Sequence, residues 1–307
     1  EGSKTYSYEV ISYSDETGKV GTVYNDNPQY VVNIGSGSNK VLEQTIRSNW
    51  EVKLGYDRAW NNHQLSVSAL YRQEMEESLG VNSSWYRHSL MGMASYNFRN
   101  KYMVDVVANR YGTSVLLKGD KFRFYPAVSA AWVLSNEDFL KDRSFVDLLK
   151  LRLSYGRSAV DNLAYGLGKH YWSSLREYYF GDSNTEVSGY LERKIPMRSL
   201  ELETADKYNI GLDVQLFKKL SFTADMYYDK RSNILVSNNK VSGMIGIDVP
   251  QQNVGKVESK GLELSLGWND KIRDFRYYIN GNVSFMDSKV LENGEGYQPY
   301  DYLYAKG

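Results

Sequence analysis

Apolar and polar residues alternate along most of the chain. In one stretch every second residue is large and apolar, at Trp50, Val52, Leu54 and Tyr56, and charged or small residues stand between them. Because successive side chains of a β-strand point to opposite faces, this period of two predicts a strand and not an amphipathic helix. About a dozen strands of ~10 residues are predicted in this way. Further stretches with the same pattern cover residues 65–71, 90–98, 122–134, 149–155, 208–216, 220–228, 262–268 and 275–285.

The connections between these predicted strands alternate between short and long. Short turns are expected at 57–63, 99–101, 217–219 and 270–273, and long links at 76–87, 111–121, 157–203 and 232–257. Short turns at one end and long links at the other are typical of an outer-membrane barrel. One helix is expected at 137–149, capped by Asn136, as a short excursion at the short-turn end. The predicted fold is therefore all-β, a transmembrane antiparallel up-and-down β-barrel of which the chain forms a part.

The length of the strands and the placement of aromatic residues favour a membrane barrel over a soluble β-protein. Strands of ~10 residues match a tilted crossing of the bilayer, whereas soluble strands average ~5–6. Aromatic residues stand at the ends of the apolar stripes, where a membrane interface would need them. Charged residues on the other face fit a wet lumen. The residues expected to face lipid are therefore Leu54, Val128, Leu212 and Leu264. Those expected to face the lumen are Lys53, Asp213 and Asp225.

Composition excludes several other classes of protein. The 37 Lys and Arg residues balance 37 Asp and Glu residues, which argues against a nucleic-acid partner. No apolar run of the ~20 residues that a spanning helix needs is present. The chain has no cysteine, and 14% of its residues are aromatic, 27 of them Tyr, as expected of a β-rich protein.

Sequence signals for catalysis are weak. The chain has no glycine-rich phosphate fingerprint and no nucleophile elbow, and His63, His88 and His170 lack ligand spacing, so no cofactor, metal or catalytic residue is predicted. Glu201 and Glu203 are alternate residues of an extended segment and suggest a glycosidase pair at most. We favour a solvated strand entrance for them.

Aromatic residues in the longest link form the best candidate binding site. Flat rings beside polar groups suit a sugar or a peptide, and long links often carry function. The alternative is that these residues pack the link on itself or on a partner. The candidate substrate-binding residues are Tyr171, Trp172, Arg176, Tyr178 and Tyr179.

Several segments resemble the barrel of SusC/RagA-type TonB-dependent outer-membrane transporters. The run Tyr96-Asn-Phe-Arg-Asn-Lys-Tyr-Met-Val-Asp-Val-Val-Ala-Asn-Arg-Tyr-Gly-Thr-Ser114 is followed in order by Phe122-Arg-Phe-Tyr-Pro-Ala-Val-Ser-Ala-Ala-Trp132 and Asn253-Val-Gly-Lys-Val-Glu-Ser-Lys-Gly-Leu-Glu-Leu264. Other matching segments are 139–141, 149–156, 208–213, 220–228, 280–285 and 289–291. The resemblance covers residues 89–291. The chain departs from the family pattern at 111–114 and 199–203.

The resemblance implies an active importer in the Gram-negative outer membrane. Such a protein has a barrel of about 22 strands around a plug, is energised through TonB, works with a SusD-like lipoprotein lid, and takes up a glycan or a peptide. Residues 1–307 are then expected to be a portion of the barrel that lacks the plug, the TonB-contacting segment and the terminal strands. We expect the short turns to be periplasmic and the long links extracellular. A passive or structural barrel, such as a porin or an adhesin, and a soluble carbohydrate-binding or hydrolytic β-protein remain as alternatives.

Overall fold

The computed structural model falls into two units by its internal contacts, Glu1–Ser48 with Met75–Ser84 and Asn49–Glu74 with Trp85–Gly307. In the smaller unit, β1 (Ile11–Ser14) and β2 (Val20–Val23) pair antiparallel. The structure describes residues 11–14, 20–23, 44–79, 83–116, 121–161, 163, 167–168, 171–180, 182, 185–197, 199–237 and 249–307.

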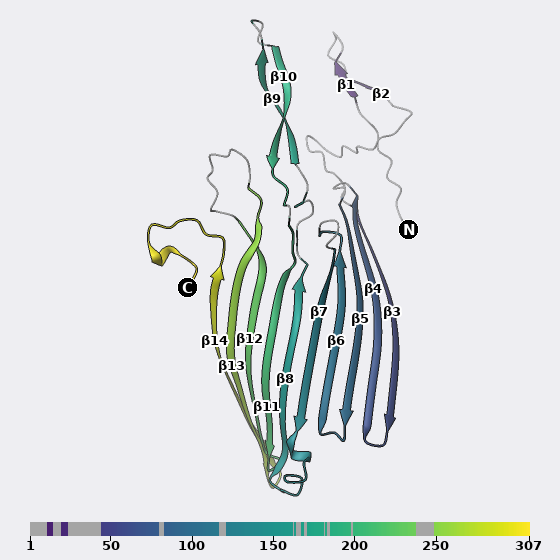
Figure 1. The fold of residues 1–307 in the computed structure, drawn as a ribbon, viewed down its shortest axis with the longest axis vertical. Helices are drawn as coiled ribbons and strands as arrows, with labels where there is room; N and C mark the ends of the chain where they lie inside the picture. The colour runs from purple at the N-terminus through teal and green to yellow at the C-terminus, as the bar shows by residue number, and fades with distance from the viewer. Residues whose placement is uncertain are drawn as a thin grey trace. The chain divides into compact units, whose positions relative to one another are not determined.

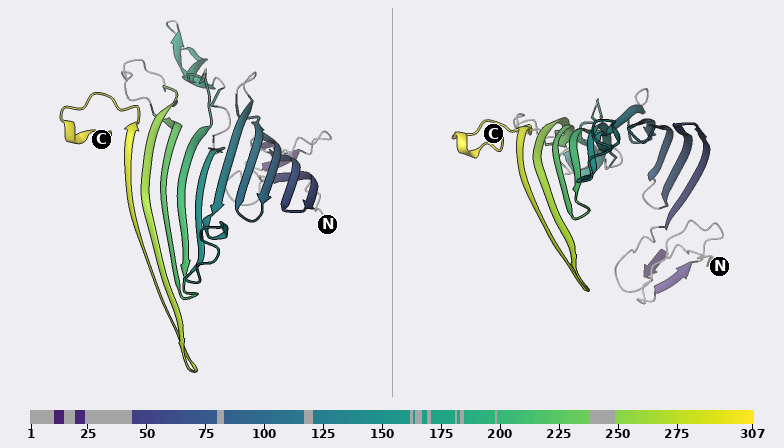
Figure 2. Two further views of the ribbon diagram at one scale, coloured as in Figure 1. Left: turned by 60° about the horizontal axis from the view of Figure 1, so that its bottom comes forward. Right: turned by 90° about the horizontal axis from the view of Figure 1, so that it is seen from below.

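A sheet of ten strands dominates the fold, and its strands are neighbours in chain order with one insertion (Figure 1). The pairings that connect β5 to β8 and β11 to β14 are antiparallel. The strands β8 and β11–β14 run side by side in further views (Figure 2). The ten strands are β3 (Gln44–Trp60), β4 (His63–Leu79), β5 (Ser83–Phe98), β6 (Tyr102–Thr113), β7 (Phe122–Val133), β8 (Val146–Val160), β11 (Glu203–Leu216), β12 (Leu220–Val236), β13 (Gln252–Ile272) and β14 (Phe275–Glu292).

The insertion between β8 and β11 is a separate two-stranded ribbon. It consists of β9 (Tyr171–Phe180) and β10 (Thr185–Lys194), which pair antiparallel. The expected all-β, up-and-down antiparallel order is confirmed. Among the described residues, no helical segment has the length and apolar character needed to cross a bilayer.

The strands of the sheet are longer than the alternation predicted. They contain from 12 residues in β6 to 21 in β13, and so exceed the ~9–11 residues of a minimal crossing. The connections between the strands are correspondingly shorter than expected. The expected long link at 76–87 is wrong, because β4 continues to Leu79 and β5 begins at Ser83. The other three long links are present but shorter, and the link at 157–203 contains the ribbon.

The short turns at 99–101 and 217–219 lie where the pattern placed them, whereas those expected at 57–63 and 270–273 are shorter, because β3 continues to Trp60 and β13 to Ile272. Turns at 61–62, 99–101, 217–219 and 273–274 join consecutive strands. Their backbone is left-handed at residues that include Asn61, Arg99, Asn100, Phe217 and Lys218, with φ between 49° and 57°. A left-handed turn follows the twist of the paired strands, which allows a tight reversal even without glycine.

The helix expected at 137–149 is wrong. Only a 3-10 turn, η1 (Leu134–Asn136), precedes a series of turns, and β8 begins at Val146. The amide of Asn136 donates to the Asn100 carbonyl (2.8 Å) and makes no cap, and Phe145 packs against Phe217 on the next short turn. The excursion does lie at the short-turn end, as expected.

The two faces of the sheet separate apolar from charged residues. Arg152 binds Asp213 and Asp225, so these three side chains share one face. Leu212 pairs with Leu151, and Leu264 pairs with Val283, on the other face. Val128 likewise pairs with Val106. Lys53 and Leu54 are consecutive in β3 and therefore point to opposite sides. The expected division into two faces is confirmed for these residues.

Candidate functional site

The short-turn end of the apolar face carries a row of stacked rings. Trp60 stacks on His63, with ring centroids 5.4 Å apart, and His63 lies 4.8 Å from Phe98. The row continues through Tyr102, 6.4 Å from Phe98, to Trp132, 6.2 Å further. It therefore connects five consecutive strands, β3 to β7. Amphipathic rings in such a row are typical of a membrane interface.

A second row of rings lies nearer the link end of the same face. Tyr155 and Tyr208 lie 5.0 Å apart, and Tyr208 and Tyr228 lie 6.2 Å apart. Beyond this row the apolar face becomes charged, beginning with Arg157, which forms two hydrogen bonds to Asp206 at 2.7 and 3.0 Å.

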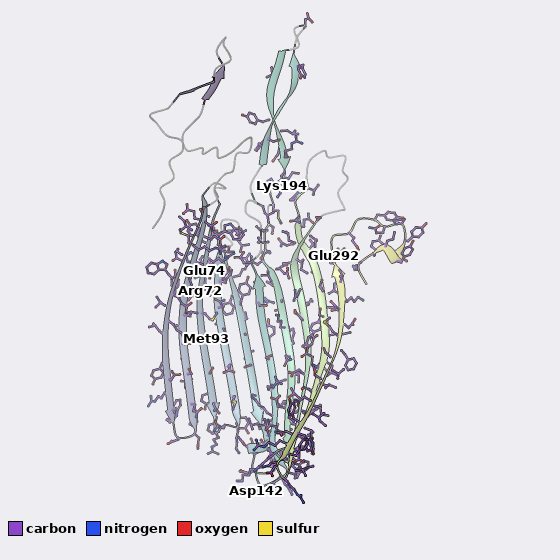
Figure 3. All side chains as sticks on the ribbon, turned by 180° about the vertical axis from the view of Figure 1, so that it is seen from behind. Arg72, Glu74, Met93, Asp142, Lys194 and Glu292 are labelled. Atoms are coloured by element: carbon purple, nitrogen blue, oxygen red, sulfur yellow. The ribbon has the colours of Figure 1, made fainter. Side chains whose placement is uncertain are left out.

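The apolar stretch between the two ends has nearly constant length. On β7 it runs from Trp132 to Phe124 and on β13 from Trp268 to Lys260, which is eight residue steps in each strand. Most of its large side chains are exposed. Charged side chains lie towards both ends of the sheet, with Arg72, Glu74 and Glu292 at the link end and Asp142 at the short-turn end (Figure 3). Apolar side chains exposed in a band between two aromatic rows form a lipid-facing surface.

Glu137 binds two rings of the row at the short-turn end. Its carboxylate accepts hydrogen bonds from Tyr102 Oη (2.7 Å), Trp132 Nε1 (3.0 Å) and Lys101 Nζ (2.9 Å). These donors, Tyr102 first, hold the pKa of Glu137 at about 2, against its ordinary value of 4.5. The carboxylate thus fixes the polar ends of two interfacial rings while their apolar bodies remain on the sheet.

The polar face carries a charge cluster that spans three strands. Arg152 on β8 donates to Asp213 at 2.8 and 3.0 Å and to Asp225 at 3.0 Å. To reach Asp225 on β12 it must pass over β11, where the residue in its path is Gly211. A Cβ there would lie 2.6 Å from the Arg152 guanidinium carbon. Glycine at this position therefore lets one cation join two carboxylates across the sheet.

The link between β8 and β11 folds against the link end of the sheet. Its buried residues pack with Tyr125 of β7 and with partly buried Tyr111 of β6, which lie on the polar face. This is the largest core among the described residues, and Leu202 is only 1% exposed. The core consists of Leu116, Tyr125, Leu163, Leu167, Met197, Leu200 and Leu202.

Ion pairs hold the same link to the strands. Asp161 Oδ2 accepts from Arg87 Nε (2.9 Å) and from Tyr111 Oη (2.6 Å). Arg123 donates to both oxygens of Glu201, at 3.1 and 2.8 Å. These contacts, with the core, hold the described residues of the link against the strands.

The position of Glu201 also bears on the glycosidase alternative. The guanidinium of Arg123 engages both carboxylate oxygens of Glu201. Glu203 lies 3.8 Å from Arg231 on a neighbouring strand. Both carboxylates are therefore paired with cations, as expected of a strand entrance.

No metal centre is formed by the residues that the structure describes, since no three metal-ligating side chains gather there. His63 Nδ1 lies 2.6 Å from Tyr96 Oη, and His88 Nδ1 lies 3.4 Å from Tyr71 Oη. His170 lies outside the described residues.

The ribbon carries all five candidate binding residues. They fall on β9, and the side chains of Trp172 and Tyr179 are described and are 56% and 60% exposed. The backbones of Tyr171, Arg176 and Tyr178 are placed in the strand, and their side chains lie outside the described part.

A β-bulge brings the exposed rings to one face of the ribbon. Trp172 pairs with Glu192 and Tyr179 with Glu186, which lie an even number of residues apart on β10. Between them the register shifts by one residue in β9. Tyr190, which is 77% exposed, lies two residues from Glu192 and four from Glu186 on β10, so it belongs to the same face of the strand as these two positions. Trp172, Tyr179 and Tyr190 therefore share one face of the ribbon, and Val187 and Leu191 belong to the other.

Tyr190 was not among the predicted residues. The signal that could have found it is the sequence Gly-Asp-Ser-Asn at 181–184, which favours a turn between two stretches of ten residues. Recognising a hairpin there would have placed residues 185–194 beside the aromatic strand.

The chain matches a known family over most of its length. The family described as TonB dependent receptor-like, beta-barrel matches residues 78–303. Among curated proteins, a TonB-dependent receptor of Formosa agariphila is 29% identical over 209 residues, which cover 66% of this chain and 20% of that protein. TonB-dependent receptor SusC of Bacteroides thetaiotaomicron is 24% identical over 66% of this chain and 20% of its own length. The chain thus spans about one fifth of these relatives.

Solved structures show the same fold. The RagAB peptide importer in its open-open state matches with a TM-score of 0.71 at 16% identity, over 81% of this chain and 30% of that one. The outer membrane transporter YddB of Escherichia coli matches with a TM-score of 0.56 at 12% identity, over 81% and 34%. The apolar band between two aromatic rows and the family match both indicate an outer-membrane β-barrel. The chain therefore belongs to the TonB-dependent receptor β-barrel family, whose members are transporters of the Gram-negative outer membrane and not enzymes.

Proposed function

We propose that the protein containing this chain imports a nutrient, a glycan or a peptide, through the outer membrane with energy delivered through TonB. Family membership supports the transport and its energy source. The relative named SusC and the fold shared with the RagAB peptide importer support a SusC-type system, in which a SusD-like lipoprotein covers the mouth. The chain itself contributes barrel wall and the connections at the mouth.

The ribbon β9–β10 is the proposed contact for the substrate, the lid or both. The observation that carries this is the set of rings Trp172, Tyr179 and Tyr190 on one face, each more than half exposed. Three large rings exposed together on a short ribbon are costly in water unless a ligand or partner covers them. Glu192 pairs with Trp172, so a polar residue stands opposite one of the rings.

Alanine substitutions on the two faces of the ribbon test this proposal. Trp172→Ala, Tyr179→Ala and Tyr190→Ala should each lower uptake several-fold, because a stacked ring contributes ~0.5–1.5 kcal/mol beyond its buried area. Val187→Ala and Leu191→Ala, on the other face, are matched controls and should leave uptake near wild type. Uptake is measured in cells and divided by the amount of protein displayed on the surface.

Two outcomes would contradict the assignment. Normal uptake per displayed molecule in all three ring variants would remove the rings from the binding surface. A loss of display with faster proteolysis of residues 157–203, at unchanged normalised uptake, would instead show that the rings only stabilise the link.

A further inference from the structure

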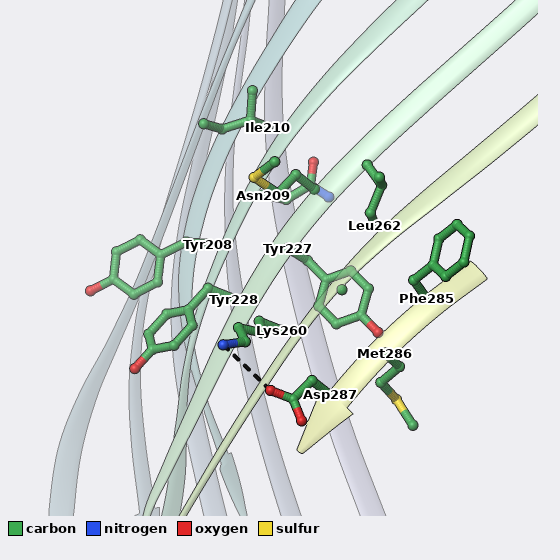
Figure 4. Close-up of a pocket in the computed structure, with 12 residues that line it drawn as sticks. Tyr208, Asn209, Ile210, Tyr227, Tyr228, Lys260, Leu262, Phe285, Met286 and Asp287 are labelled. Atoms are coloured by element: carbon green, nitrogen blue, oxygen red, sulfur yellow. Dashed lines mark ion pairs between the residues drawn. The ribbon is translucent and has the colours of Figure 1, made fainter. Parts of the chain in front are cut away.

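A hollow of about 560 Å³ lies on the apolar face of the sheet, across β11 to β14 (Figure 4). Alternate residues of the four strands form its walls, and the backbone between them forms its floor. Leu262 on β13 lies at its centre, between Met226 and Phe285, with which it pairs. The outward-facing residues that line it are Tyr208, Ile210, Met226, Tyr228, Lys260, Leu262, Phe285 and Asp287.

The position of the hollow shows what covers it. It lies inside the apolar band, and its upper end reaches the row of rings formed by Tyr155, Tyr208 and Tyr228. In an outer-membrane barrel this face meets lipid, so acyl chains and not water fill the hollow. Met226 and Phe285 are 59% and 60% exposed and offer apolar walls to such a chain.

A cation stands where the apolar part of the hollow ends. Lys260 Nζ lies 3.4 Å from Asp287 Oδ2, and the two side chains are 66% and 69% exposed. This long, exposed contact leaves the other protons of the ammonium group available to a ligand. A long Lys side chain at the edge of the apolar band places its charge at headgroup level.

The other charges at this end are more fully engaged. Glu258 accepts the Tyr228 hydroxyl at 3.1 Å, and Asp206 is held by the two hydrogen bonds from Arg157. Lys230 lies between them in register, opposite Asp206 on one side and Glu258 on the other. Lys260 is thus the cation nearest the hollow, and Asp287 is the carboxylate that competes for it.

We propose that this hollow is a binding site for a phosphorylated lipid, with one acyl chain over Leu262 between Met226 and Phe285 and the phosphate on Lys260. The apolar walls provide affinity for the chain, and the ammonium group provides selectivity for the anionic head. This site depends on the membrane location that follows from family membership, and it is independent of the import proposal.

Lipid retention by the full-length transporter tests the site. The protein is purified in detergent, mixed with dioleoylphosphatidate or with uncharged dioleoylglycerol, and bound lipid is counted by native mass spectrometry. Wild type should retain phosphatidate about five-fold better, the ratio expected for one lysine near an anionic head. Lys260→Gln should reduce that ratio to about one, and Asp287→Asn should raise phosphatidate binding, because it removes the competing carboxylate.

Matched variants separate the site from general effects. Leu262→Trp should fill the hollow and lower retention of both lipids, whereas Leu264→Trp, two residues along the same face, should not. Lys271→Gln removes a cation from the opposite end of β13 and should leave the ratio unchanged. Heat-modifiable migration in gels shows that each barrel is folded.

Four results would overturn the proposal. The first is an unchanged phosphatidate ratio in Lys260→Gln, and the second is equal retention in Leu262→Trp and wild type. If Leu262→Trp converts a dimer into a monomer without changing lipid retention, the hollow is a contact between two copies. Displacement of phosphatidate by inorganic phosphate would show a site for the free anion and would equally contradict the lipid assignment.

Discussion

At the scale of single residues, Glu137 shows how one carboxylate positions an interfacial row. Tyr102, Trp132 and Lys101 all donate to it, and each of the two rings keeps its apolar body on the sheet. A charged acceptor binds such donors more strongly than a neutral amide would. The arrangement depends on the ionised form of Glu137 and therefore on pH.

The difference in thermal stability between wild type and Glu137→Gln should change with pH. The folded pKa of about 2 lies below the ordinary value of 4.5, so the carboxylate stabilises the fold fully above pH 4.5 and loses this effect as the pH falls towards 2. The melting temperature of the full-length protein in detergent, followed from pH 7 to pH 2, measures it. A difference that stays constant or grows on acidification would contradict the assigned pKa.

Leu212 tests which face meets lipid. It lies between Tyr208 and Leu216, in the middle of the apolar stretch of β11, so it should be near the bilayer midplane. Leu212→Arg should lower the free energy of unfolding by about 2–4 kcal/mol in vesicles. Asn209→Arg, on the polar face of the same strand, should cost much less. Equal losses in reversible urea unfolding of the two variants would refute the assignment of the faces.

The candidate site could be predicted from sequence only in part. The high density of aromatic residues at 171–180 pointed to Trp172 and Tyr179 as candidates, because a solvent-exposed link usually contains few large rings. Composition gives no information on pairing, so Tyr190 was missed. Nor could it show that a one-residue register shift in β9 places Trp172 and Tyr179 on one face. The ion pairs of Asp161 and Glu201 join residues more than 70 positions apart, which no local pattern reports.

At the scale of elements, period-two alternation predicted the strands well because one face of the sheet is uniformly apolar. It failed for residues 137–149, where a helical apolar stripe was equally visible. Two tertiary interactions decide that segment, since Asn136 donates to Asn100 and Phe145 packs on Phe217. The lengths of the strands were also underestimated, because the alternation reports only the part of a strand that has an apolar face. Beyond the membrane the alternation fades, but hydrogen bonding to the neighbouring strand continues.

The two ends of the strands should lie on opposite sides of the membrane. An epitope inserted at Lys218, in the short turn between β11 and β12, should be hidden from antibodies on intact cells and become accessible after the outer membrane is permeabilised. The same epitope inserted beside Asp182, in the turn of the ribbon, should be accessible on intact cells. Labelling at Lys218 on intact cells would reverse the orientation.

At the scale of the whole molecule, this chain supplies a section of barrel wall and the connections at the mouth. Ten neighbouring strands give the wall, and the core around Leu202 packs the described residues of the link between β8 and β11 onto it. The relatives are about five times as long, since the chain spans 20% of their length. The activity proposed here therefore belongs to the longer protein, to which this chain contributes the wall, the ribbon and the proposed lipid site.

Because the apolar stretch has a nearly constant length, the barrel should fit best in a bilayer of matching hydrophobic thickness. Eight residue steps of ~3.3 Å span ~26 Å along a strand, or ~20 Å along the membrane normal for a tilt of ~40°. A thick bilayer would have to thin locally around such a wall, at a cost that grows with each ångström of mismatch. The full-length protein should accordingly fold in higher yield into dilauroyl- than into dioleoyl-phosphatidylcholine vesicles. Replacing Trp132 by Ala, which removes one of the rings that set the lower limit, should weaken that preference, and an equal yield in both lipids for wild type would show that the spacing of the rows does not select membrane thickness.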